Sequence, residues 1–170
     1  MKIMFVSDVH GSKKYLEKIR DIYKEEMPNK TIFLGDIYYG GDDFHKEIED
    51  IILSFQNCYV IKGNCDSQID IMTSHFGFLD FYYFEEFGKK IFCSHGNIYN
   101  ISRFPDKEFD CLVYGHTHFG LIINKNNKYF LNPGSITSPR SGSVNSYMIL
   151  DDNGIYLKDL ERNIIEKLEW

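Results

Sequence analysis

The sequence predicts an α/β fold in which a helix-covered, mainly parallel β-sheet is followed by a β-rich C-terminal third. In the first part of the chain, short apolar runs alternate with amphipathic stretches, a pattern typical of parallel βαβ units. Farther on, turn signals follow one another closely, which is typical of antiparallel hairpins. No linker, internal repeat or low-complexity stretch interrupts the chain, so we expect residues 1–170 to form a single domain.

The first half of the chain predicts the order strand, helix, strand, helix, strand. The strands are expected at residues 2–7, 31–35 and 58–62, and the helices at residues 12–27 and 44–55. The first helix carries apolar side chains at helical spacing and should end at Pro28. The second places Ile48, Ile51 and Ile52 on one face. Two such helices would cover one face of a parallel sheet.

The second half of the chain is dominated by strands. A short helix is expected at 67–75, a strand within the aromatic segment 78–87, and buried strands at 90–94 and 111–114. The polar stretches 124–128 and 151–154 each separate two apolar runs. These stretches predict the turns of two antiparallel hairpins.

Composition narrows the class of protein. The 170 residues are 43% hydrophobic and 16% aromatic, which is enough to build a core and argues against disorder. The 25 acidic residues exceed the 19 basic ones, so the net charge of -6 disfavours extended nucleic-acid binding. The cysteines lack a C-x-x-C spacing and are expected to be reduced; they are Cys58, Cys65, Cys93 and Cys111. Without a signal-peptide pattern or a membrane-spanning run, the chain is expected to be cytoplasmic.

Polar side chains follow five of the predicted strands. They are Asp8 and His10 in FVSDVHG, Asp36 in FLGD, Asn64 in IKGNCD, His95 in FCSHG, and His116 and His118 in VYGHTH. In α/β sheets, ligand sites assemble at the carboxyl ends of strands. We therefore expect four of the six histidines to converge there.

These residue types indicate a metal site. Imidazole, carboxylate and amide ligands without thiolate suit manganese, iron, zinc or similar divalent ions. In extended backbone, residues two positions apart project from the same face, which applies to Asp8 with His10 and to His116 with His118. Seven ligands exceed the need of one ion but suit two ions that share a carboxylate. Two ions, two aspartates and a hydroxide would carry a charge of about +1, which favours a phosphate ester attacked in line by bridging hydroxide.

The spaced motifs resemble those of the calcineurin-like metallophosphoesterases. The motifs D-x-H, G-D, G-N-[HC]-[DE], H-G and G-H-x-H occur here in that order, beginning at Asp8, Gly35, Gly63, His95 and Gly115. The motif GNCDS and the later motif NPGS, followed by Pro139-Arg140, are similar to motifs of small bacterial and archaeal YfcE-type phosphodiesterases. The resemblance extends over essentially the whole chain.

The resemblance implies a four-layer αββα sandwich, in which two facing mixed β-sheets are flanked by helices. It assigns Asp8, His10 and His118 to one ion, Asn64, His95 and His116 to the other, and Asp36 to both. Manganese is the expected ion, and iron, nickel and zinc are also compatible.

Cys65 stands where many members of the family have a histidine that assists the leaving group. A thiol is neutral at pH 7 and a weak donor, so we expect phosphodiesters or good leaving groups as substrates. Asn64, Cys65, Asp66 and His95 are the candidate catalytic residues, with Asp66 either orienting its neighbour or capping the following helix. Tyr38 and Arg140 are candidate substrate contacts, and the Gly40-Gly41 turn is expected to border the site.

Two other functions are compatible with the same fold. One is a phosphomonoesterase or nucleotidase, and the other is a non-catalytic Vps29-like interaction scaffold. The complete ligand set disfavours the scaffold. We expect a small phosphate ester as the partner, without extended nucleic acid or membrane, and a possible homo-oligomer, dimeric or tetrameric.

Overall fold

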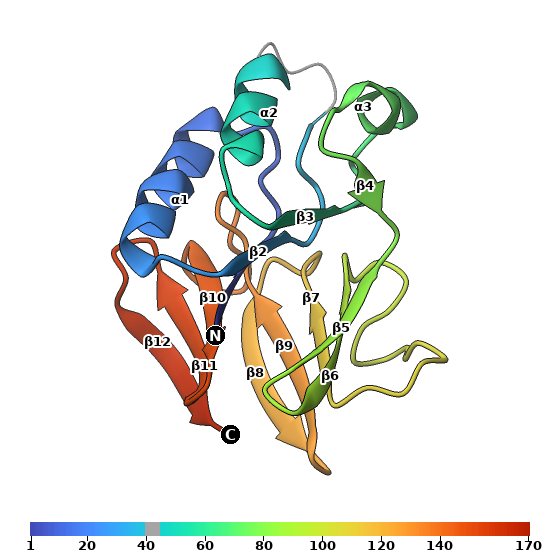
Figure 1. Cartoon of the computed structure of the whole chain (residues 1–170), viewed down its shortest axis with the longest axis vertical. Coiled ribbons are helices and arrows are strands. Elements are labelled where there is room, and N and C mark those ends of the chain that lie inside the picture. The colour runs from blue at the N-terminus through green and yellow to red at the C-terminus, as the bar shows by residue number, and fades with distance from the viewer. Residues whose placement is uncertain (40–44) are drawn as a thin grey trace.

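The computed structural model describes residues 1–39 and 45–170, which form two β-sheets packed face to face (Figure 1). The strands of the first sheet are β1 (Lys2–Val6), β2 (Lys30–Phe33), β3 (Cys58–Ile61), β4 (Phe78–Leu79), β10 (Ser146–Asp151), β11 (Gly154–Asp159) and β12 (Ile164–Glu169). The strands of the second are β5 (Tyr82–Glu86), β6 (Lys89–Ser94), β7 (Cys111–Tyr114), β8 (Gly120–Lys125) and β9 (Lys128–Pro133). The described helices are α1 (Lys13–Glu26), α2 (His45–Leu53) and α3 (Gln68–Thr73).

Both sheets are mixed. The first has the order β12-β11-β10-β1-β2-β3-β4, and its strands β1 to β4 run parallel. The second has the order β5-β6-β7-β9-β8, with β6, β7 and β9 parallel. The predicted α/β fold with a parallel βαβαβ start is therefore confirmed. The two predicted hairpins are also present, as β8 with β9 and β10 with β11.

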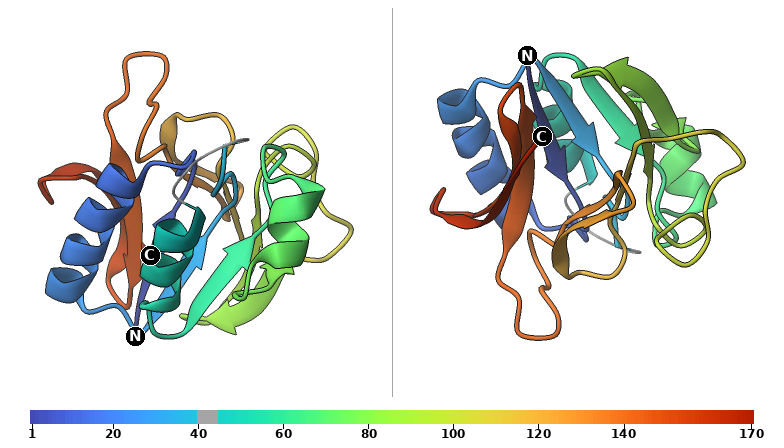
Figure 2. Two further views of the ribbon diagram at one scale, coloured as in Figure 1. Left: turned by 90° about the horizontal axis from the view of Figure 1, so that it is seen from above. Right: turned by 90° about the horizontal axis from the view of Figure 1, so that it is seen from below.

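Helices α1 and α2 cover one face of the first sheet (Figure 2). Helix α1 buries Leu16, Ile19 and Ile22 at helical spacing, and it ends at Glu26. Its C-cap Met27 has a left-handed conformation and precedes Pro28. Helix α2 buries its three isoleucines in the same cluster. The predicted start of this helix at Phe44 and the predicted Gly40-Gly41 turn lie outside the described residues.

Alternation along the strands builds the cores on either side of the first sheet. In β1, Met4 and Val6 pack against the helices, whereas Ile3 and Phe5 pack between the two sheets. A third apolar cluster lies on the second sheet, where Phe92, Leu112 and Phe130 pack with Phe109 from the segment after β6.

Strand β12 was not predicted. Its side chains are largely exposed, and it pairs with β11 only at the edge of the first sheet. An edge strand of this kind shows no apolar pattern because its main contribution is backbone hydrogen bonding. No helix in the described part of the chain is long and apolar enough to span a bilayer.

Candidate metal centre

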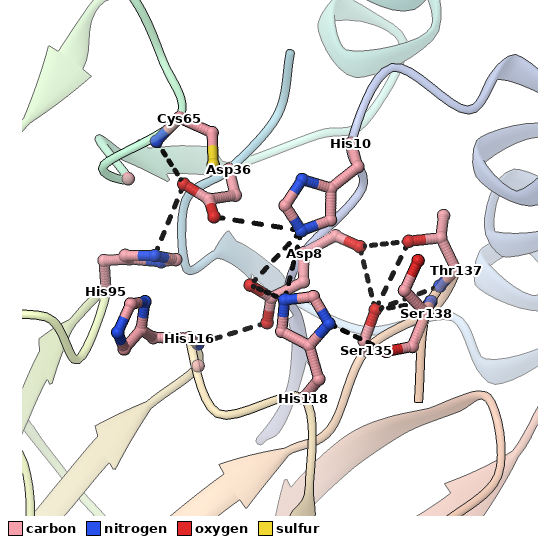
Figure 3. Close-up of polar contacts among 12 residues, drawn as sticks. Asp8, His10, Asp36, Cys65, His95, His116, His118, Ser135, Thr137 and Ser138 are labelled. Atoms are coloured by element: carbon pink, nitrogen blue, oxygen red, sulfur yellow. Dashed lines mark hydrogen bonds and ion pairs between the residues drawn. The ribbon is translucent and has the colours of Figure 1, made fainter. Parts of the chain in front are cut away.

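Side chains from the carboxyl ends of strands in both sheets meet in one place (Figure 3). Their potential ligand atoms form two groups, within each of which the atoms lie no more than 4.8 Å apart. The first group is Asp8, His10, Asp36 and His118, and the second is Asp36, His95 and His116. Asp36 belongs to both groups, so its carboxylate lies where two neighbouring cations would share a ligand.

In the first group, ring nitrogens and carboxylates point at one another. The Nε2 atoms of His10 and His118 lie 3.1 Å apart. His118 Nε2 lies 3.3 Å from Asp8 Oδ1, and His10 Nε2 lies 3.8 Å from Asp36 Oδ2. Two imidazole nitrogens and two carboxylates directed at a common centre are a ligand set for a divalent cation.

The second group is centred on His95. Its Nε2 atom lies 3.3 Å from Asp36 Oδ1 and 3.1 Å from the amide oxygen Oδ1 of Asn64. The His116 ring lies beside it, with the ring centroids 5.1 Å apart. The structure thus brings Asn64 to the second group, as the family resemblance implied.

Backbone carbonyl groups orient two of the histidines. His95 Nδ1 lies 2.6 Å from the Leu34 carbonyl oxygen, and His118 Nδ1 lies 2.7 Å from that of Ser138. A carbonyl oxygen only accepts, so each Nδ1 carries the proton and donates it. The Nε2 lone pair of each ring is then directed into the centre, which is the usual arrangement of metal-binding histidines.

The two carboxylates are deeply buried. Asp8 is fully inaccessible, and its Oδ1 atom receives no hydrogen bond from any described residue. Asp36 is 2% exposed, and its Oδ1 accepts a bond of 2.8 Å from the backbone N–H of Cys65. A buried carboxylate oxygen without a donor is costly unless a cation lies beside it. Together with the ring orientations, this atom shows that the residues fit a divalent cation, and the sharing of Asp36 by both groups is consistent with a pair.

The pKa is raised for two of the four histidines and lowered for the other two. Burial alone would raise the pKa of Asp36, but the hydrogen bond and charge of His95 outweigh it and hold that pKa well below its usual range. The pKa of His95 is raised because Asp36 outweighs its burial, and that of His118 is raised mainly because its protonated ring could donate a hydrogen bond to Asp8. Burial lowers the pKa of His10 and of His116. Divalent cations compete with protons for the ring nitrogens of these histidines.

The backbone at the site differs from the extended form assumed in the sequence analysis. Asp8, His10, Asp36, His116 and His118 all have positive φ values, between 46° and 66°. The pairs converge because each follows a strand in a sharp turn, not because the backbone is extended. His116 and His118 consequently point into different groups. Non-glycine residues rarely adopt this conformation, and such strain is typical of functional sites.

A glycine next to Asn64 permits the close approach of two loops. A Cβ atom at Gly63 would collide with the backbone nitrogen and the carboxylate of Asp36. Any larger residue would therefore displace the shared carboxylate.

Asp66 organises the loop that carries Asp36. Its Oδ1 accepts N–H bonds from Ile37 and Tyr38 at 2.8 and 3.0 Å, and its Oδ2 accepts from Asp36 and Gly63 at 3.0 and 2.7 Å. The interpretation of Asp66 as a helix cap is wrong, because Ser67 caps α3. The contacts of Asp66 are those of a positioning residue.

Cys65 lies beside the shared carboxylate. Its sulfur is 3.5 Å from the Asn64 amide nitrogen. Burial and the nearby Asp36 carboxylate raise the pKa of the thiol to about 11. Cys65 is therefore neutral at pH 7, as the sequence analysis expected.

The two candidate substrate contacts differ. The prediction for Tyr38 needs correction, because its ring is 1% exposed and stacks on His45, and its hydroxyl oxygen accepts a hydrogen bond from Ser74 Oγ at 3.3 Å. Its neighbour Tyr39 is exposed and approaches His10 edge-on, with the ring centroids 5.9 Å apart. Arg140 is exposed, and its positive charge acts on the His118 ring. Arg140 therefore stays a candidate substrate contact.

Sequence reasoning gave no role to the hydroxyl groups that fix the turn after β1. Ser135 Oγ and Thr137 Oγ1 donate to the Asp8 carbonyl oxygen at 3.1 and 2.8 Å. Asn132 donates to the Gly115 carbonyl oxygen at 2.8 Å and so holds the turn before His116. The NPGS segment was the only signal in the sequence for these residues.

The chain is similar to known phosphoesterases. A family model described as a calcineurin-like phosphoesterase superfamily domain matches residues 1–154. Phosphodiesterase YfcE of Escherichia coli strain K12 is 29% identical over 163 residues, which cover 90% of this chain and 89% of that protein. The probable metallophosphoesterase YsnB of Bacillus subtilis is 28% identical over 181 residues, which cover 99% of this chain and 97% of that protein.

Solved structures show the same fold. The structure of the phosphoesterase YfcE from E. coli superposes with a TM-score of 0.90 at 26% identity, covering 99% of both chains. Vps29 from Entamoeba histolytica, solved with zinc, superposes with a TM-score of 0.66 at 24% identity and covers 99% of both chains. The second likeness is one of fold alone.

Proposed function

Because the chain belongs to the calcineurin-like phosphoesterase superfamily, we propose that it is a phosphodiesterase that uses two divalent metal ions to hydrolyse a small phosphodiester. One observation carries the proposal. The Asp36 carboxylate lies between two groups of histidines, with Oδ2 toward His10 and Oδ1 toward His95. A single carboxylate shared in this way is typical of dinuclear centres.

Each ion would have its own set of ligands. Asp8, His10 and His118 would hold the first, Asn64, His95 and His116 the second, and Asp36 both. When bound, such ions supply Lewis-acid stabilisation of the phosphoryl group and lower the pKa of water, which favours in-line hydrolysis. Manganese remains the ion we propose, because imidazole and carboxylate ligands without thiolate suit it.

The residues of the chain orient this chemistry. The Leu34 and Ser138 carbonyl groups hold the Nε2 atoms of His95 and His118 toward the centre. Asp66 holds the backbone on both sides of the shared carboxylate. The seven ligands carry two negative charges when the histidines are neutral, so two divalent ions leave the centre positive and attractive to a phosphate ester.

Cys65 favours a diester over a monoester. Its thiol stays neutral, is a weak hydrogen-bond donor and lies next to Asp36. Leaving groups that need strong protonation, such as alkoxides, would receive little help from this side chain. The similarity to phosphodiesterase YfcE supports the same substrate class.

The partners and location are part of the proposal. A small phosphate ester fits the positive centre, whereas the net charge of -6 disfavours long polyanions. All four cysteines are free thiols, which supports a reducing compartment such as the cytoplasm. A homo-oligomer stays a prediction.

The test combines metal analysis with a substrate pair. Purified protein is loaded with Mn²⁺, and bound metal is counted for the wild type and for Asp36→Asn. Rates are then compared on bis(4-nitrophenyl) phosphate and 4-nitrophenyl phosphate. We expect two ions per wild-type chain and a preference for the diester. A preference for the monoester would favour the monoesterase, and a chain without bound metal or activity would favour the interaction scaffold.

A further inference from the structure

A cavity of about 310 Å³ opens next to the second group of ligands. Its wall includes His95 and Gly63, which neighbour the metal centre, and Phe81, Ile98 and Tyr99, which do not. Its lining residues come in part from the β4–β5 connection and from the segment after β6. His95 thus lines both the cavity and the centre. A group attached to phosphorus at the centre would have the cavity directly beside it.

The wall remote from the centre contains apolar and aromatic side chains beside the polar Asn97. Phe81 is 39% exposed, and one face of its ring is stacked on the buried Phe92, with the centroids 5.1 Å apart and an angle of 15° between the rings. Packing thus fixes the position of the ring, and the Lys107 ammonium group also lies over it, with Nζ 6.0 Å from the ring centroid. Ile98 is also exposed at this wall. A rigid, exposed aromatic ring is well suited to stack on another planar ring.

The charged groups of the cavity neutralise each other. Lys62 Nζ lies 2.5 Å from Asp80 Oδ1, and both residues line the cavity. Ser94 already donates its hydroxyl group to the Tyr99 carbonyl oxygen at 2.9 Å. Among the described residues that line the cavity, Lys62 and Asp80 are paired with each other and offer no free charge to a second phosphate group. The cavity favours an uncharged substituent.

From these contacts, and resting on the phosphodiesterase function proposed above, we propose that the cavity binds a planar aromatic substituent of the substrate, stacked on Phe81. The substrate class is then a phosphodiester with an aryl group or a nucleobase within reach of phosphorus. The volume agrees with this, because it lies at the small end of ligand pockets and suits one ring system rather than a polymer. Phe81 is accordingly a residue that determines specificity rather than a catalytic residue.

The inference is tested by calorimetry with probes that carry one substituent each. Phenylphosphonate and methylphosphonate are titrated into the Mn²⁺-loaded wild type, Phe81→Ala and Phe81→Leu. The leucine retains apolar packing on Phe92 but lacks a flat ring. Phe104→Ala is the matched control, since Phe104 is 51% exposed and stacks on Phe130 at a different cavity.

We expect the wild type to bind phenylphosphonate about fivefold to tenfold more tightly than methylphosphonate. Both Phe81 variants should lose most of this ratio, and Phe104→Ala should keep it. Thymidine 5′-monophosphate separates the two sources of the ring. If the Phe81 variants bind thymidine 5′-monophosphate more weakly than the wild type does, the cavity accepts a nucleobase. If they lose affinity for phenylphosphonate alone, the cavity accepts a simple aryl group.

Equal affinities of the wild type for the two phosphonates would overturn the inference, as would an unchanged ratio in the Phe81 variants. If the proposed function itself were wrong, the experiments would give a different result. In that case the wild type would bind neither metal nor any probe and would not hydrolyse bis(4-nitrophenyl) phosphate, whatever residue stands at position 81.

Discussion

Replacing Asp66 by asparagine tests whether this residue positions the metal centre or takes part in the reaction. The carboxylate accepts four backbone N–H bonds, two on each oxygen. An asparagine has one acceptor oxygen, so it can retain one pair, and its NH₂ group would face the other two N–H groups. Asp66→Asn should therefore leave two buried backbone donors without acceptors.

The expected loss of stability in Asp66→Asn follows from those two donors. Each buried donor without an acceptor costs about 1–3 kcal/mol. Part of this cost is offset, because burial raises the pKa of Asp66 and the amide no longer buries a charge. We expect a net loss of about 2–4 kcal/mol in the free energy of unfolding. For a chain of this length, the melting temperature should fall by roughly 5–15 °C.

The assay is urea unfolding of the metal-free protein, followed by circular dichroism, together with a count of bound Mn²⁺. Asp70→Asn is the control, since Asp70 is also buried but, among the described residues, its carboxylate accepts one backbone N–H, from Ser67, and lies 3.4 Å from His45 Nε2; it should lose about 1 kcal/mol or less. Metal binding should weaken in Asp66→Asn only, because Asp36 loses its backbone support. Wild-type stability and two bound ions, combined with a tenfold or larger fall in kcat, would refute the positioning role.

Three further predictions follow from the site and its surroundings. Cys65→His should raise the rate on glycerol phosphate relative to bis(4-nitrophenyl) phosphate at least about tenfold, because imidazole is a better general acid; an unchanged ratio in steady-state assays contradicts the leaving-group argument. Glu26→Gln should destabilise the fold by about 1–3 kcal/mol at pH 7. Burial opposes ionisation of Glu26, but hydrogen bonds from Lys158 and Tyr147 outweigh it and lower its pKa. This stabilisation is present above about pH 4.5 and is lost as the pH falls through the lowered pKa. The difference in unfolding free energy between the wild type and Glu26→Gln, measured by urea titration, should therefore be largest near pH 7 and shrink as the pH falls below about 4.5, and exposed Glu25→Gln should show neither effect. Free Mn²⁺ at 100 times its dissociation constant should stabilise the wild type by about 2.7 kcal/mol, visible as a rise in melting temperature that EDTA reverses; no rise in the wild type would argue against a metal centre.

Much of the fold could be predicted because its elements bury their side chains in regular patterns. The isoleucines of α2 recur at helical spacing, and β1 alternates between two cores. Strand β12 lacks such a pattern, since it is held by backbone bonds at an exposed edge. The segment after β6, which packs on the second sheet, was missed for a similar reason. Its aromatic Phe109 is recognisable as apolar, but nothing local shows which surface it covers.

The candidate ligands could also be predicted, although the reason given for their convergence was partly wrong. Extended backbone would have placed His116 and His118 on one face, yet both residues have positive φ and point to different groups. Tyr38 shows a second limit of predicting the site from the sequence. It follows Asp36 closely in the sequence, but its ring turns into the core, while Tyr39 faces His10. A shift of one residue in an irregular turn reverses the direction of a side chain, and no periodicity reports it.

The sequence by itself determined which chemical groups are available and where along the strands they stand. The residue types and their places after apolar runs were sufficient to indicate a cluster of metal ligands at strand ends. The tertiary structure alone decided that Asp36 lies between two groups, that Asp66 holds its loop, and that a cavity with Phe81 in its wall adjoins His95. Those features depend on contacts between segments far apart in the chain. They arise from the packing of the two sheets and from turns with strained backbone, which local patterns of residues do not encode.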